Sequence, residues 1–371
     1  MRTDPRRTTR GLAPNGLLPL REKVAEGRMR GGRERKPSGV ESVPETEPSP
    51  EGDADRPLIR PFGPPSPSRG EGDDRASSGF TLVELLVVVG VISVLIALLL
   101  PAVQAVREVA RRVQCTNNLL QIGVALENYA ASSRVYPPGV VDHQGPVDNR
   151  PTGYRFGWAA RILPFLEQRN VYNHLNFHIG AFAEENRTAA GVRLNGYSCP
   201  SSPYNSLSSY AGCHGDVEKP IGADDSGVFV LNGRVARSDL VDGPAFTIFV
   251  GDVRGVIPYG GWAVGNSATL RNAGWRINDD RAPDVAQARR AGYPWNQPVG
   301  RGFDPAALEA LFESGELKPD VIGGFSSSHG AGANFLFGDG SARFLKNMID
   351  RRVFRALADR SDGEIVDGDA Y

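Results

Sequence analysis

Residues 78–103 read SGFTLVELLVVVGVISVLIALLLPAV, an apolar run that contains one carboxylate, Glu84, near its start. From Leu85 to Val106 there are 22 consecutive residues without a charge. As a helix rising 1.5 Å per residue, this run would span about 33 Å, enough to cross a hydrocarbon core of about 30 Å. We therefore predict a membrane-spanning helix. A carboxylate in such a helix is costly and requires a partner or a function.

The apolar run continues without a break into an amphipathic segment. Pro101 lies between the two halves, where it is expected to bend the helix, and the YPPG at 136–139 ends it. Spacings of three and four residues indicate a helix with one apolar face. The residues predicted to form this face are Val103, Val106, Ala110, Val113, Leu119, Ile122, Leu126 and Tyr129.

The 79 residues that precede the helix differ sharply from it in composition. Residues 1–36 hold 11 basic side chains against 4 acidic ones, and residues 41–55 hold six acids and no base. Rich in Pro, Gly and Ser, this segment cannot bury a core, and we expect it to be disordered. A start codon assigned too far upstream explains it equally well. From Gly79 onward acids outnumber bases by 30 to 27, which argues against a nucleic-acid partner.

Residues 132–356 predict a loop-rich α+β head with an antiparallel sheet, followed by a frayed acidic tail at 357–371. Helical segments are expected at 157–175, with a break at Pro164, and at 304–314. Strands are expected at 226–233 and 245–252. ANFLFGDGSARFLK (333–346) predicts a hairpin that turns at Asp339 and Gly340.

The cysteines, Cys115, Cys199 and Cys213, are too few for a disulfide scaffold and too scattered along the chain for a zinc site. If the head lies outside the cytoplasm, Cys199 and Cys213 form a disulfide bond or remain two buried thiols. Both alternatives are open. The sequence holds no phosphate-binding loop, dinucleotide fingerprint or zinc signature, so we predict no metal or cofactor.

Gly79 followed by FTLVELL resembles the type IV prepilin signature. The resemblance implies that a membrane prepilin peptidase cuts after Gly79 and methylates the new amino terminus at Phe80. Glu84 would then be the fifth mature residue, placed to neutralise that amine within one chain or between neighbouring chains. Residues 80–106 would form the membrane helix and 107–131 its amphipathic continuation. Pro101 stands where pilins commonly carry a helix-bending proline.

Two other interpretations of the apolar run remain. One is a plain signal anchor in which Glu84 is merely tolerated. The other is a secretory signal cut at the small residues of VQA (103–105), which would leave Val106 as the first mature residue. The arginines that flank the run do not decide its orientation, so placing the head outside the cytoplasm depends on the prepilin resemblance.

Four further blocks resemble a large bacterial family of pseudopilin-like proteins: CTNNLLQIGVALENYAASSRVYPPG, WAARILPFLEQ, YSCPSSP and HGAGANFLFGDGSARFLK. That family ends in a His, nine residues and Asp-Gly, a spacing matched by His329 with Asp339 and Gly340. The middle of the chain departs from the family pattern, since DGPAFTIFVGDVRG stands where such proteins often carry a Gly-Glu pair.

Together the two resemblances imply a structural assembly protein and not an enzyme. It would be a single-pass protein of the bacterial inner membrane with a periplasmic or surface-exposed head, and a candidate subunit of a type II secretion or pilus-like fibre. Its partners would be prepilin peptidase, other pilin-like subunits or its own copies, and membrane lipid. The alternative is a membrane-anchored ligand-binding module or hydrolase that uses the region of His329 and Asp339.

Overall fold

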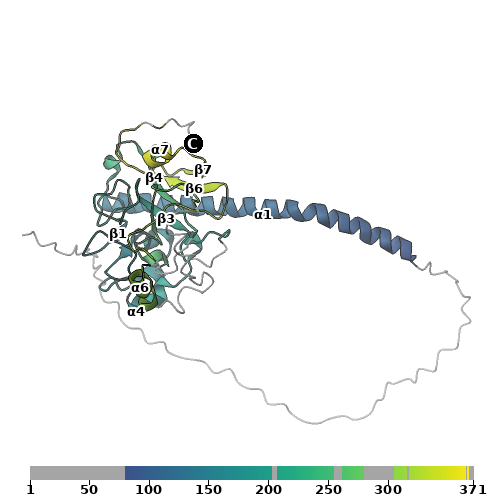
Figure 1. Cartoon of the computed structure of the whole chain (residues 1–371), viewed down its shortest axis with the longest axis horizontal. Helices are drawn as coiled ribbons and strands as arrows, with labels where there is room; N and C mark the ends of the chain where they lie inside the picture. Colours follow the sequence, from purple (N-terminus) through teal and green to yellow (C-terminus); the bar gives the residue numbers. More distant parts are fainter. Residues whose placement is uncertain are drawn as a thin grey trace, which may run out of the picture. The chain divides into compact units, whose positions relative to one another are not determined.

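The computed structural model describes residues 80–202, 207–254, 261–279, 305–315, 317–364 and 366, with residues 305–308 as backbone only. These residues belong to one compact unit (Figure 1). A long N-terminal helix precedes a mixed head with a mostly antiparallel sheet, which confirms the predicted α+β class. The expected leader, residues 1–79, lies outside the described residues.

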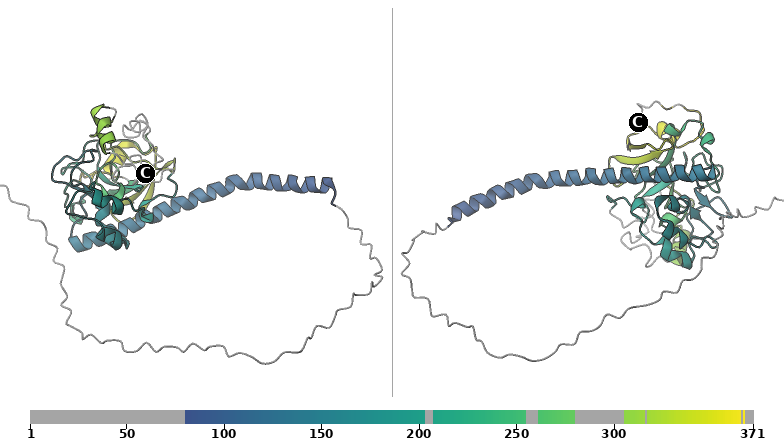
Figure 2. Two further views of the ribbon diagram at one scale, coloured as in Figure 1. Left: turned by 90° about the horizontal axis from the view of Figure 1, so that it is seen from below. Right: turned by 180° about the vertical axis from the view of Figure 1, so that it is seen from behind.

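The helix α1 spans Leu82–Ser133 and passes through Pro101 without interruption. It begins two residues later and ends two residues later than predicted. Arg134 closes it in the left-handed conformation, with φ 65°, and donates its backbone N–H to the Ala130 carbonyl. Figure 2 shows that α1 curves as it leaves the head.

The first half of α1 is apolar and lies outside the head. Among the described residues, α1 is the helix long and apolar enough to cross a membrane. Every residue from Leu82 to Val106 is exposed, so no part of the head covers this segment. The segment thus has the length, composition and exposure that the predicted membrane span requires.

The second half of α1 packs on the head through one face, here called the docking face. Its members recur at spacings of four and three, as expected for one side of a helix. They are Glu108, Arg112, Cys115, Leu119, Ile122 and Leu126. Gly123 allows the closest approach, since a Cβ there would lie 2.9 Å from Leu336 of the sheet.

The predicted amphipathic helix is present, but its apolar residues divide between a side that the head covers and a side that it leaves exposed. Leu119, Ile122 and Leu126 are buried, but Val103, Val106, Ala110 and Val113 are exposed. The helical period continues through 103–113, but Glu108 and Arg112 occupy the side that faces the head. The valines of that region therefore point elsewhere.

The central sheet has the strand order β5-β3-β4-β6-β7. All its pairings are antiparallel except β3 with β5. The strands are β3 (Tyr210–Gly215), β4 (Ile248–Asp252), β5 (Leu270–Asn272), β6 (Gly332–Phe337) and β7 (Ala342–Lys346). The predicted hairpin is confirmed, because β6 and β7 pair in register from Gly332↔Lys346 to Leu336↔Ala342.

Each face of the sheet carries a hydrophobic cluster, because side chains alternate along a strand. On β6, Leu336 joins the cluster that includes Leu119 and Ile122 of α1. Its neighbours Phe335 and Phe337 join the second cluster, which includes Phe354 of α7 (Arg351–Ala356). The sheet is therefore covered by α1 on one face and by α7 on the other.

The remaining elements are short and line the head. They are β1 (Val140–Val141), β2 (Phe156–Gly157), α2 (Trp158–Arg161), η1 (Leu163–Leu166), α3 (Arg169–Asn173), α4 (Glu184–Ala190), η2 (Asn195–Tyr197), η3 (Arg237–Asp239), η4 (Pro244–Phe246), η5 (Gly261–Ala263) and α6 (Pro305–Glu313). The helical segment predicted at 157–175 is present as α2, η1 and α3. The helix predicted at 304–314 is α6.

Two local predictions were wrong. Residues 226–233 are not a strand: they form a buried bend whose Gly227 and Phe229 N–H groups donate to the carbonyls of His214 and Cys213. The beginning of the tail is not frayed either. Leu357 and Ala358 are buried in the second cluster, and the Arg360 carbonyl accepts from Val241.

We predict that Leu119→Ala destabilises the chain by about 2–5 kcal/mol, because it removes a buried side chain from the contact between α1 and the sheet. Leu119 is 0% exposed, whereas its neighbour Leu120 is 39% exposed. The matched change Leu120→Ala should alter the free energy of unfolding by no more than about 0.5 kcal/mol. Urea unfolding in detergent, followed by tryptophan fluorescence, measures both; equal losses would contradict the docking geometry.

Candidate functional site

A capping box closes the first turn of α1. The Glu84 carboxylate accepts from the Thr81 N–H at 2.9 Å and from the Thr81 hydroxyl at 2.8 Å. In return the Glu84 N–H donates to the Thr81 hydroxyl at 3.3 Å. The reciprocal bonds satisfy backbone donors that the helix itself leaves unpaired. The carboxylate at the start of the apolar run is thus stabilised within its own chain.

This cap was not among the features predicted from the sequence, although a local signal for it is present. Thr81 followed three residues later by Glu84, ahead of an apolar run, is the Ser/Thr-x-x-Glu pattern of a capping box. Phe80 lies just outside the helix and is exposed, and Gly79 lies outside the described residues. The predicted cleavage between them and the charge pairing of Glu84 stay predictions, as does a bend caused by Pro101.

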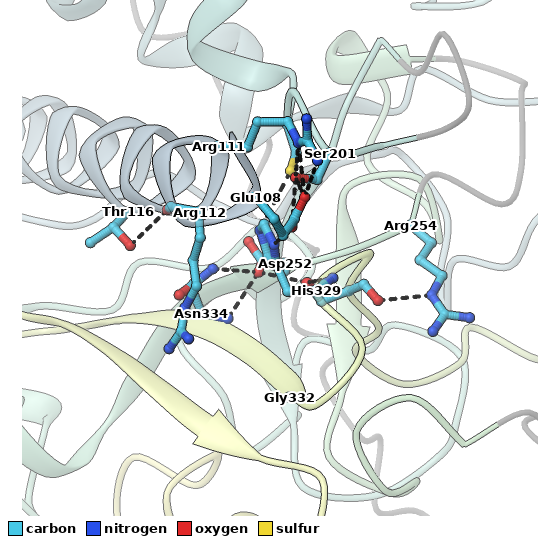
Figure 3. A network of polar contacts seen from close by, with 12 residues as sticks. Glu108, Arg111, Arg112, Thr116, Ser201, Asp252, Arg254, His329, Gly332 and Asn334 are labelled. Carbon is cyan, nitrogen blue, oxygen red and sulfur yellow. Dashed lines mark hydrogen bonds and ion pairs between the residues drawn. The ribbon is translucent and has the colours of Figure 1, made fainter. Parts of the chain in front are cut away.

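The loop before β6 holds His329 against α1 (Figure 3). The His329 ring contacts the Glu108 carboxylate through Nδ1 at 2.9 Å. Glu108 also accepts from the Ser201 hydroxyl at 3.0 Å and pairs with Arg111. The His329 side chain is only 2% exposed, whereas the Glu108 side chain is 42% exposed, so the contact lies at the edge of the junction between helix and head.

Two thiols complete this junction. The Sγ of Cys199 lies 3.7 Å from Nε2 of His329. Cys115 comes from the docking face of α1, and its Sγ lies within 4.8 Å of the Cys199 and His329 ligand atoms. We call Glu108, Cys115, Cys199 and His329 the helix–head cluster.

The members of the cluster shift one another's pKa. A hydrogen bond with the Cys115 thiol is the largest cause that lowers the pKa of Cys199, and the contact with His329 acts in the same direction. Burial raises the pKa, and the result of these opposing effects is a pKa of about 5. Burial lowers the pKa of His329, but hydrogen bonds with Cys199 and Glu108 outweigh it and raise the pKa to about 9. Thiolate and imidazolium therefore stabilise each other in a buried site.

A buried carboxyl, Asp252, positions the loop that carries His329. Its Oδ2 accepts from the Ser327 hydroxyl at 3.0 Å and from the N–H and Nδ2 of Asn334, both at 2.9 Å. The Ser327 hydroxyl in turn accepts from the His329 N–H at 3.2 Å. Burial raises the pKa of Asp252 to about 6 despite these bonds. Asp252 thus ties the end of β4 to the start of β6.

The motif of His329 with Asp339 and Gly340 does not form one site. Asp339 lies in the turn after β6, accepting from the Ser341 N–H at 2.9 Å, and Gly340 supplies the positive φ of 83° that the turn requires. His329 precedes the same strand. A six-residue strand separates its two ends by about 20 Å, so the two side chains do not act on one group.

The three cysteines are free thiols in the structure. The Cys213 thiol donates to the Gly215 and Ala358 carbonyls, each at 3.7 Å, within the second hydrophobic cluster. Cys199 instead lies with Cys115. The disulfide between Cys199 and Cys213 stays a prediction, while the geometry makes Cys115 the thiol neighbour of Cys199.

A capped apolar helix, continued by an amphipathic half that docks on an α+β head, defines a pilin-like architecture with a membrane anchor. Residues 74–100 match the prokaryotic N-terminal methylation motif. Residues 104–352 match the family described as protein of unknown function (DUF1559), and the chain belongs to that family. The motif and the helix together indicate a prepilin-like protein anchored in the inner membrane, of a kind that is typically structural and not enzymatic.

The chain is also similar to the type II secretion system core protein G of Vibrio cholerae serotype O1. The two are 26% identical over 139 residues, which cover 33% of this chain and 93% of that relative. This is a distant relationship to a secretion pseudopilin. No solved structure matches the chain significantly.

We predict an energetic coupling between Glu108 and His329. In metal-chelating buffer, Glu108→Gln and His329→Gln should show a coupling of about 0.5–1 kcal/mol in a double-mutant cycle of urea unfolding, because each change removes the same contact. Arg343 pairs with Asp339 at the far end of β6. The control pair Arg343→Gln with His329→Gln should be additive. Additivity of the first pair would show that the contact contributes nothing.

Proposed function

We propose that this chain is a pseudopilin-like assembly protein. Prepilin peptidase removes residues 1–79 and methylates Phe80, residues 80–106 anchor the chain in the inner membrane, and the head lies in the periplasm. Assembly proceeds by lateral packing of α1 against pilin-like neighbours, its own copies included. The observation that carries this proposal is an apolar face of α1 that the head leaves exposed.

We call this face the apolar stripe. Its residues recur at helical spacings beyond the apolar run, and they are Val106, Val109, Val113, Leu120 and Val124. Val106 is 68% exposed and Val124 is 61% exposed. At 100° per residue the apolar stripe lies about 140° around the helix from the docking face.

The position of the apolar stripe on α1 supports lateral assembly. It extends the lipid-exposed surface of the membrane half along the side of α1 that faces away from the head. A continuous exposed apolar patch of this kind marks an interaction surface. A second helix of the same type covers both its membrane half and its extension, whereas lipid covers only the membrane half.

The Glu84 carboxylate supplies the charge that fixes where one α1 helix packs against its neighbour. Its carboxylate uses part of its acceptor capacity on Thr81 and retains further acceptor positions. Cleavage after Gly79 creates an amine on Phe80, close to this carboxylate in sequence. An unpaired carboxylate near the membrane interior costs up to a few kcal/mol. Pairing with the amine of the same or a neighbouring chain therefore favours the assembled state.

The distant relationship to a type II secretion core protein supports a role in a secretion-type or pilus-like assembly. The alternative of a hydrolase built on His329 and Asp339 receives no support, because those side chains lie at opposite ends of β6. A ligand-binding head on a passive anchor differs from our proposal in one respect: it does not require Glu84.

We expect the mature protein to begin with N-methyl-phenylalanine at Phe80. Intact-mass and N-terminal peptide analysis of protein isolated from bacterial membranes measures this. A mature chain that begins at Val106 would refute processing by prepilin peptidase and support a secretory signal.

We expect Glu84→Ala and Val113→Asp to abolish self-association in membranes. The first removes the charge partner, and the second places a carboxylate in the apolar stripe. Two differently tagged copies expressed together should co-purify after mild solubilisation when both are wild type. The fraction recovered should fall at least tenfold for either variant.

Gln121→Asp is the matched control, because Gln121 is exposed on α1 but lies off the apolar stripe. It should co-purify like wild type. Undiminished association of Val113→Asp would rule out the apolar stripe as the contact. Undiminished association of Glu84→Ala, with methylated Phe80 present, would favour the passive anchor.

A further inference from the structure

The helix–head cluster assembles three soft-metal ligands from segments far apart in the chain. Cys115 lies in the middle of α1, Cys199 follows η2, and His329 precedes β6. Their ligand atoms lie within 4.8 Å of one another. The exposed fractions are 0% for Cys115, 6% for Cys199 and 2% for the His329 side chain. A chance grouping of surface side chains does not explain a cluster that is both this compact and this buried.

The spacing suits tetrahedral coordination. With Zn–S bonds of about 2.3 Å and a Zn–N bond of about 2.0 Å, neighbouring ligand atoms of a tetrahedron lie about 3.5–3.8 Å apart. Cys199 Sγ and His329 Nε2 are separated by 3.7 Å. The remaining separations do not exceed 4.8 Å, so coordination requires the ligand atoms to approach by about 1 Å at most.

The orientation of the imidazole is also that of a metal ligand. Because the Glu108 carboxylate only accepts, His329 Nδ1 carries the proton in their 2.9 Å contact. Nε2 faces Cys199, and loss of its proton leaves a lone pair directed at the thiols while Nδ1 keeps its proton. Metal-bound histidines almost always donate their second ring N–H to a carboxylate, a backbone carbonyl or water, and Glu108 is such a partner.

We propose that Cys115, Cys199 and His329 bind one thiolate-preferring divalent cation of the zinc class. Binding releases two protons to solvent, one from the Cys115 thiol and one that the Cys199 sulfur shares with His329 Nε2, so the dication and two thiolates are neutral together. Thiolate and imidazole donors exclude calcium and magnesium, which require oxygen ligands. Three protein ligands leave the fourth position to water or to an exogenous ligand.

This metal would lock α1 to the head. One ligand belongs to the docking face and two belong to loops of the head, so a single ion joins three segments. The site goes beyond the assembly function and does not depend on it, because neither the apolar stripe nor Glu84 takes part.

Cobalt titration of the full mature chain in detergent tests the proposal. The protein is isolated from membranes without reductant, and its thiols are counted after denaturation. We expect three free thiols and one Co²⁺ bound per chain, with a sulfur-to-cobalt charge-transfer band that Zn²⁺ removes. X-ray absorption of the zinc form should show two sulfur and one nitrogen protein ligands.

Single substitutions distinguish metal binding at this cluster from metal binding at the thiol outside it. Cys115→Ser, Cys199→Ser and His329→Gln should each lower the affinity for Co²⁺ at least a hundredfold. Cys213→Ser, which removes the buried thiol outside the cluster, should leave it unchanged. Glu108→Gln should retain the spectrum but weaken binding about 10–100-fold, since it only orients the ring.

Three outcomes would overturn the proposal. The first is a single free thiol in the isolated protein, which would indicate a disulfide between Cys115 and Cys199 in place of the metal. The second is cobalt bound without a charge-transfer band. The third is a wild-type spectrum in the Cys115→Ser and Cys199→Ser chains. If a variant fails to fold, X-ray absorption of the wild-type chain still decides the matter.

Discussion

The packing of α1 on the sheet through one narrow face is the contact on which the rest of the structure depends. Leu119 and Ile122 enter the core beside Leu336, and Gly123, which has no Cβ, leaves room for the Leu336 side chain. Since a helix has only one side toward any flat surface, this contact determines where every other residue of α1 points. The exposed apolar stripe and the solvent-side charges are its consequences.

The same contact explains why polar groups occur in the junction. The His329 side chain is buried, and burying a polar ring is costly unless its nitrogens find partners, which the half-exposed Glu108 carboxylate supplies at Nδ1. Asp252 holds the loop of His329 through Ser327 and Asn334, so the ring reaches Glu108 in one defined orientation. Such a network adds specificity to a hydrophobic contact that would otherwise tolerate sliding of the helix by a turn.

Local patterns in the sequence predicted the membrane half of α1, the amphipathic half, the hairpin of β6 and β7, and the α+β class. Each of these features depends on residues that are consecutive or close together in the sequence, such as the uncharged run from Leu85 to Val106. The bend at 226–233 was mistaken for a strand because buried bends and strands share the same apolar composition. Which side of α1 the head covers over 103–113 did not follow from the sequence, because periodicity gives the spacing of apolar residues and not the surface against which they pack.

The sequence by itself determined the apolar helix that begins at Leu82 with Thr81 as its N-cap, since its charge pattern, length and cap are properties of consecutive residues. Only the tertiary structure decided that Cys199 lies beside Cys115, and that His329 contacts Glu108 and not Asp339. Those residues are separated by more than 80 positions in one case and 220 in the other. Their proximity arises from the packing of α1 on the sheet, and no local pattern encodes it.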